Sequence, residues 1–136
     1  MTTFVLDSST ILRLLDSEPG ADRVEEILTA HMNQSAEAII SAIQWGEVAG
    51  LVRKKHGVAG QIRALEDLAF FQMRVVPATE ERAVLAATIK EDRKFPYADA
   101  FALELAIDTS NSVLVTADYD FKKVDDMARI EFLPIK

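Results

Sequence analysis

The sequence contains no cysteine, which excludes both a disulfide framework and a thiolate metal site. Its two histidines, His31 and His56, stand far apart, and its five glycines form no phosphate-binding loop. There is no long hydrophobic run and no basic N-terminal segment before an apolar stretch, so the sequence predicts neither a signal peptide nor a membrane span. We therefore expect a cytoplasmic protein that has no contact with the membrane.

Positive charge is also scarce, because 15 lysines and arginines face 22 aspartates and glutamates, for a net charge of -7. Contacts to phosphate supply much of the affinity of nucleic-acid-binding proteins, so this balance speaks against a general nucleic-acid binder. Net charge nevertheless describes solubility and steering rather than any one site. Acidic residues gathered around cations would themselves become part of a phosphate-binding surface.

The order of short β-rich runs and longer helical runs predicts an α/β fold in one domain, residues 1–136. Such alternation is typical of a parallel sheet with helices on its faces. The predicted strands are 4–6, 38–41, 74–76, 112–115 and 130–133. The predicted helices are 9–15, 21–31, 42–55 (ended by Gly57), 60–71, one that begins near Thr79, and 97–108.

Two aspartates stand where predicted strands end. Asp7 follows the first strand and precedes Ser8-Ser9-Thr10, where it could simply cap the next helix. Asp118 follows the fourth strand and has the same two interpretations. Both nevertheless lie at the carboxyl edge of the predicted sheet, where open α/β folds bind ligands.

Two further acids fit a packing or capping role less well. Asp99 lies in the first turn of the predicted helix 97–108, on the face of Leu103, whereas Glu104 projects from another face. Glu47 stands in the middle of a predicted helix, where it cannot be a cap. Glu47 can share the edge of the sheet with Asp7 and Asp118, but Asp99 must reach it from a helix running the other way or from a loop. Carboxylates packed together repel one another unless a cation neutralises them, which favours hard divalent ions.

The segments around these acids carry a family resemblance. They are Val5-Leu6-Asp7-Ser8-Ser9, Ser41-Ala42-Ile43-Gln44-Trp45-Gly46-Glu47, Tyr97-Ala98-Asp99-Ala100 and Val115-Thr116-Ala117-Asp118-Tyr119-Asp120-Phe121. In this order the sequence resembles the PIN-domain nucleases over nearly its whole length. The short chain and the pair Asp120-Phe121 are most similar to the VapC branch, the toxin halves of bacterial VapBC toxin–antitoxin pairs.

The resemblance implies a PIN-like three-layer α/β/α domain with a central, roughly five-stranded parallel sheet. It also implies a Mg²⁺- or Mn²⁺-dependent endoribonuclease that hydrolyses phosphodiester bonds of tRNA, rRNA or mRNA and inhibits translation. Its expected partners are a VapB-like antitoxin and a second copy in a homodimer. By the same resemblance, Asp7, Glu47, Asp99 and Asp118 would bind metal and catalyse, with support from Ser9, Thr116 and Asp120. The segment before Asp99 departs from the small or glycine-rich approach of many relatives, which bears on substrate choice.

Two basic clusters flank the predicted site, and we expect them to grip phosphates of the RNA: Lys90, Arg93 and Lys94 on one side, Lys122 and Lys123 on the other. Two alternatives stay open, namely an RNA-processing PIN nuclease without an antitoxin and a non-catalytic metal-binding interaction module. Other acidic-edge proteins fit less well. A metal-dependent adhesion motif needs a serine where Ile11 stands, and a haloacid-dehalogenase phosphatase needs an aspartate where Ser9 stands. A response-regulator receiver needs an aspartate ending a middle strand, and Val76 is followed by no acid.

Overall fold

Short apolar strands and longer helices alternate along residues 1–136, all of which the computed structural model describes. Each predicted strand and helix is present, with bounds that differ by two residues at most apart from the fusion of two helices described below. The elements are β1 Thr3–Leu6, α1 Ser8–Leu15, α2 Ala21–Met32, β2 Glu37–Ser41, α3 Ala42–Ala69, β3 Arg74–Val76, α4 Glu80–Arg93, α5 Tyr97–Asp108, β4 Ser112–Thr116, the 3-10 helix η1 Tyr119–Val124 and β5 Ile130–Phe132.

The five strands form one parallel sheet in the order β3-β2-β1-β4-β5. The chain first moves outward from β1 through β2 to β3. The helices α4 and α5 then carry it back to β4, which pairs with the other side of β1. The direction of the strand order therefore changes between β1 and β4. In open α/β sheets, ligands bind at the carboxyl ends of the strands beside such a switch point.

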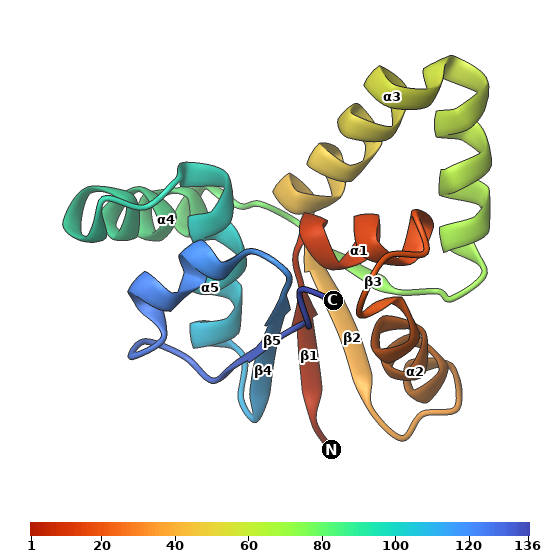
Figure 1. The fold of residues 1–136 in the computed structure, drawn as a ribbon. Coiled ribbons are helices and arrows are strands. Elements are labelled where there is room, and N and C mark those ends of the chain that lie inside the picture. The colour runs from red at the N-terminus through yellow and green to blue at the C-terminus, as the bar shows by residue number, and fades with distance from the viewer.

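Helices cover both faces of the sheet, which confirms the three-layer α/β/α architecture (Figure 1). The helices α4 and α5 lie on one face, and α1, α2 and α3 lie on the other. Strand residues alternate between the two cores, because side chains in a strand point to opposite faces. Val5 and Leu114 pack under α5, whereas Leu6 and Val115 belong to the core beneath α1 and α2.

Helix α3 is bent at Gly57, where the sequence predicts that a helix ends. The backbone there has φ 75° and ψ −171°, a region that is nearly restricted to glycine. The two halves of α3 stand above α1 and fold back towards the sheet (Figure 1). A second glycine is needed at the bend, since a Cβ atom at Gly60 would collide with the Cβ atom of His56. The prediction of two helices is thus correct in geometry, although they form a single bent element.

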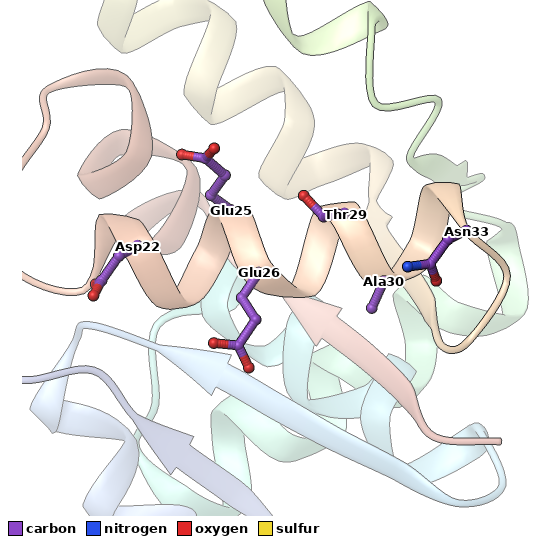
Figure 2. Close-up of a pocket in the computed structure, with 6 residues that line it drawn as sticks. All are labelled: Asp22, Glu25, Glu26, Thr29, Ala30 and Asn33. Atoms are coloured by element: carbon purple, nitrogen blue, oxygen red, sulfur yellow. The ribbon is translucent and has the colours of Figure 1, made fainter.

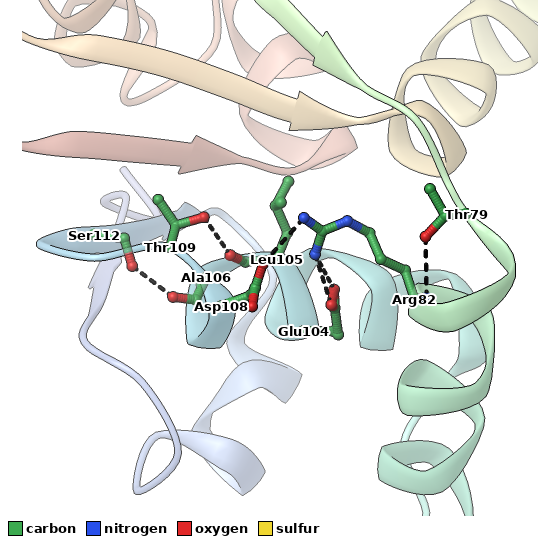
Figure 3. Close-up of polar contacts among 8 residues, drawn as sticks. All are labelled: Thr79, Arg82, Glu104, Leu105, Ala106, Asp108, Thr109 and Ser112. Atoms are coloured by element: carbon green, nitrogen blue, oxygen red, sulfur yellow. Dashed lines mark hydrogen bonds and ion pairs between the residues drawn. The ribbon is translucent and has the colours of Figure 1, made fainter.

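Helix α5 is buried between the sheet and α4, and this corrects the prediction that Glu104 projects away from the packing face. Glu104 is only 4% exposed. Both of its carboxylate oxygens accept hydrogen bonds from Nη1 of Arg82 on α4, at 2.7 and 2.9 Å, while Nη2 of Arg82 donates to Asp108 at 3.1 Å (Figure 3). A buried carboxylate is tolerated here because an arginine satisfies it. None of the helices combines the length and the apolar character needed to cross a bilayer.

Candidate active site

The four predicted acids lie around the carboxyl edge of the sheet at the switch point between β1 and β4. Asp7 comes directly after β1 and is only 2% exposed. Its Oδ1 atom accepts a hydrogen bond of 3.1 Å from the backbone N–H of Thr10, so Asp7 does cap α1. Asp118 follows β4 and caps η1 by accepting a bond of 2.9 Å from the N–H of Asp120. Capping therefore accounts for part of the role of both residues.

Three hydroxyl and amide contacts fix Asp7 beside Asp118. The hydroxyl of Ser9 donates to Oδ1 of Asp7 at 2.7 Å, and that of Thr116 donates to Oδ2 at 2.6 Å. The same Thr116 oxygen accepts from the backbone N–H of Asp118 at 2.9 Å. A carboxylate can accept about four hydrogen bonds. Asp7 accepts three, from the hydroxyls of Ser9 and Thr116 and from the N–H of Thr10. One position is therefore left for a further ligand. Ser9 and Thr116 thus lie where the resemblance places supporting hydroxyl groups.

The other two acids reach the edge from helices. Oε1 of Glu47, on α3, accepts a hydrogen bond of 3.0 Å from the hydroxyl of Ser8. Asp99 lies in the first turn of α5. Because α5 runs back to the start of β4, its first turn lies at the carboxyl ends of the strands. This is the first of the two arrangements expected from the sequence, a helix running opposite to the strands.

The electrostatics of the four carboxylates show that they lie within reach of one another. Burial, followed by repulsion from Asp118, Asp7 and Glu47, raises the pKa of Asp99 from 3.8 to about 7, and only the amide of Gln44 acts in the other direction. Burial also raises the pKa of Asp7 to about 6, with a smaller contribution from Asp118, against the lowering effect of its hydrogen bonds. The edge of the sheet therefore holds negative charge that no basic side chain compensates.

This donor set suits a hard divalent cation. Every candidate ligand is a carboxylate oxygen, and a cation beside Asp7 and Asp99 would favour their charged forms. No group of three or more histidine, aspartate or glutamate side chains is spaced so that it could hold a metal ion by itself. Mg²⁺ does not require such a group, since it commonly keeps several waters and takes one or two carboxylates from the protein. The residues present therefore fit such an ion.

Two residues at this edge were not found from the sequence, Ser8 and Gln44. Ser8 touches Glu47 through its hydroxyl, and its backbone N–H donates to Oε1 of Gln44 at 2.7 Å. A signal for Gln44 was present, because it shares the buried stripe of α3 with Val48 and Val52 at helical spacing. A polar residue in an apolar stripe, one turn before a candidate catalytic acid, indicates a specific contact. Ser8 had no such signal.

The remaining predicted residues are more exposed. Asp120 contributes its backbone N–H to Asp118, but its exposed side chain makes no polar contact. Nη1 and Nη2 of Arg93 donate to the two carboxylate oxygens of Asp126, at 3.0 and 2.7 Å. Nζ of Lys90 lies 3.4 Å from Oε1 of Glu91. Lys94, Lys122 and Lys123 are exposed, and Nζ of Lys122 lies 5.5 Å from the ring centre of Tyr119. Of the five predicted RNA-contacting residues, Arg93 and Lys90 are thus paired with acids in the fold.

A hollow of about 540 Å³ on the surface of α2 does not involve these acids. It is lined by Asp22, Glu25, Glu26, Thr29, Ala30 and Asn33. Figure 2 shows the carboxylates of Glu25 and Glu26 projecting from opposite sides of the helix. The hollow is open and its acids do not converge, so we place the functional site at the edge of the sheet instead.

Comparisons with known proteins bear on the fold of the whole chain. The family model described as PIN domain matches residues 4–127. A chain of VapBC2 from Rickettsia felis, bound to a DNA fragment from its promoter, is similar in structure, with a TM-score of 0.75, 16% identity, and 97% and 99% of the two chains covered. VapC20 from Mycobacterium tuberculosis, a sarcin-ricin loop cleaving toxin, is similar with a TM-score of 0.71 and 15% identity. The match covers 96% of this chain and 99% of the VapC20 chain. A chain of DNA-bound VapBC from Salmonella typhimurium has a TM-score of 0.71 and 18% identity, with 97% of this chain and 98% of that chain covered. A sequence search of curated proteins found no match.

Proposed function

The chain belongs to the PIN-domain family, and on that premise we propose that it is a metal-dependent endoribonuclease, the toxin of a VapBC-type toxin–antitoxin pair. The observation that carries the proposal is the set of four carboxylates, Asp7, Glu47, Asp99 and Asp118, at the β1/β4 switch point. Burial is the main cause that raises the pKa values of Asp7 and Asp99 there, repulsion from neighbouring carboxylates adds to it, and no basic side chain forms an ion pair with either residue. Purely structural acids are usually paired, as Glu104 is with Arg82.

In this proposal, Asp7 and Asp118 would hold Mg²⁺ or Mn²⁺ directly, and Glu47 and Asp99 would bind or orient water beside the ion. A bound divalent ion supplies a Lewis acid for the phosphate oxygens and a water of lowered pKa. The contribution of the chain is orientation. The hydroxyls of Ser9 and Thr116 hold both oxygens of Asp7, and the hydroxyl of Ser8 holds Oε1 of Glu47.

RNA is the proposed substrate, and the exposed Lys94, Lys122 and Lys123 are the proposed contacts to neighbouring phosphates. They lie on the segments that lead into Asp99 and out of Asp118. Reversing the charge of Lys122 and Lys123 should weaken RNA binding. It should also reduce the slope of the logarithm of the binding constant against the logarithm of the salt concentration by about two, because each lysine neutralises one phosphate. Arg93 serves the fold through Asp126, and Lys90 is a weaker candidate beside Glu91.

Two exposed apolar regions support the proposed protein partners. A hollow of about 420 Å³ between α1 and α3 is lined by Leu12, Leu51 and Val52 beside three basic side chains, and we assign it to a VapB-like antitoxin. A second hollow of about 300 Å³, between α4 and α5, includes Leu85 and Ile107, which are 46% and 48% exposed. We assign that face to a homodimer. Light scattering of wild type and Leu85→Glu tests the dimer directly.

Cleavage of RNA by the purified chain tests the central proposal. We expect cleavage with Mg²⁺ or Mn²⁺, none with EDTA, and a loss of at least about 100-fold in Asp7→Asn. Asp67→Asn removes an exposed acid of α3 that contacts none of the four carboxylates and serves as the control. Activity that survives EDTA, or that is equal in wild type and Asp7→Asn, would refute the nuclease site.

A further inference from the structure

Gln44 is an amide in a position where the packing pattern calls for an apolar side chain. It lies on α3 in line with Val48 and Val52, and it is fully buried, with an exposure of 0%. Burying an amide is unfavourable unless its donor and its acceptor are both satisfied. Here they are satisfied, and the partners belong to two other elements of the site.

The two partners of Gln44 are backbone groups next to two of the acids. Oε1 accepts a hydrogen bond of 2.7 Å from the N–H of Ser8, and Nε2 donates one of 2.6 Å to the carbonyl of Ala98. The peptide plane that contains the N–H of Ser8 also contains the Cα atom of Asp7. The plane that contains the carbonyl of Ala98 also contains the Cα atom of Asp99. Because peptide planes are rigid, holding these two groups fixes the origins of both carboxylate side chains.

Glu47, a third acid of the site, contacts the same residue, Ser8, as Gln44 does. Glu47 lies three residues after Gln44 on α3, so both side chains project from the same side of the helix. Ser8 donates to Gln44 through its backbone and to Glu47 through its hydroxyl. One turn of α3 therefore contacts the segments of Asp7 and Asp99 while it carries Glu47.

We propose that Gln44 is a positioning residue of the acidic site, whose amide sets the separation of Asp7 and Asp99 for a divalent cation. The inference rests on the proposed nuclease function and adds to it a residue outside the carboxylate set. An amide is required because one partner is a donor and the other an acceptor, and no apolar side chain of the same length serves both. Its contribution to metal binding is distinct from a contribution to packing, which an unbranched apolar side chain would preserve.

The test compares Gln44→Met, which has a similar length and no strong hydrogen-bonding group, with wild type. Titration calorimetry with MnCl₂ alone should show Mn²⁺ binding weakened by about 10- to 100-fold, the range found when groups that orient metal ligands are removed. Cleavage should lose kcat by a similar factor, with KM for RNA within about threefold of wild type. Amide hydrogen exchange at Ser8 should become faster, because its acceptor is gone. Leu28→Ala, which opens a cavity in the core under α2, is the control for reduced stability and should keep Mn²⁺ affinity.

The outcomes separate this inference from the proposed function. A folded Gln44→Met that binds Mn²⁺ within about threefold of wild type would overturn the positioning role and leave the nuclease intact. Gln44→Asn, whose shorter amide reaches only one partner, decides the matter where Gln44→Met fails to fold, and it too should bind Mn²⁺ more weakly. If both variants are unfolded, the amide is a folding requirement and the inference fails. A wild-type chain that binds no Mn²⁺ would overturn the proposed function, and this inference with it.

Discussion

Neutralising Asp99 should make the metal-free protein more stable while it abolishes the proposed activity. The pKa of Asp99 rises from 3.8 to about 7, first because of burial and then because of repulsion from Asp118, Asp7 and Glu47. Each pKa unit corresponds to about 1.4 kcal/mol, but Asp99 is partly exposed and water screens part of the repulsion. Ionised Asp99 therefore lowers the free energy of unfolding by about 2 kcal/mol at pH 8. We expect Asp99→Asn to recover about half of this, because the amide must still be buried and hydrogen-bonded.

The pH dependence has a definite sign. The unfolded chain releases the Asp99 proton near pH 3.8, whereas the folded chain keeps it until about pH 7. The folded state binds more protons between these values, so the stability of the metal-free wild type should fall as pH rises from about 4 to 7. The fall should be smaller in Asp99→Asn, in which Asp7 with its pKa of about 6 remains.

Urea unfolding in EDTA at pH 5 and pH 8 measures both effects. Asp67→Asn makes the same change in net charge at an exposed position on α3 and should leave the difference between the two pH values unchanged. Adding Mg²⁺ at 100 times its dissociation constant should stabilise wild type by about 2.7 kcal/mol and Asp99→Asn by much less. The reasoning is refuted if Asp99→Asn is no more stable than wild type at pH 8 without metal.

Three further changes have expected outcomes. Thr116→Val removes the 2.6 Å bond to Asp7 and should reduce RNA cleavage by about 10- to 100-fold, whereas Thr116→Ser should retain it; equal rates in the two variants would show that the hydroxyl is dispensable. Gly57→Ala should lower the free energy of unfolding in urea by about 1–3 kcal/mol because of its φ of 75°, and the control Gly50→Ala, in a regular helical turn, should not lower it. Arg82→Met should lower the same free energy of unfolding by about 3–5 kcal/mol, because Glu104 is then buried without its partner. If the double variant Arg82→Met/Glu104→Leu is no more stable than Arg82→Met alone, this explanation is contradicted.

The fold was predictable because periodicity and turn residues agree along the chain. All five strands and the bend at Gly57 follow from short β-rich runs and glycine positions. The position of Asp99 at the edge of the sheet was one of two open arrangements, because the direction of α5 depends on the crossover from β3 to β4. The burial of Glu104 was mispredicted, since a one-sided helical pattern says nothing about a second layer formed by α4.

The acids of the candidate site could be named from the sequence, but their connections could not. The side-chain amide of Gln44 contacts backbone groups of Ser8 and Ala98, which lie 36 and 54 positions away in the sequence. Such contacts depend on how three elements meet in space, and only the interrupted apolar stripe of α3 points to one of them. The pairing of Arg93 with Asp126 is of the same kind, because charge alone does not indicate which basic side chains are left unpaired.

The central place of β1 in the sheet also has a consequence for synthesis of the protein. Asp7 is made 109 residues before its neighbour Thr116, which comes with β4, the strand that pairs with β1. A nascent chain on the ribosome can complete the sheet beside β1, and with it the acidic site, only after residues 112–118 have emerged. The proposed ribonuclease site is thus incomplete for as long as β4 remains inside the ribosome.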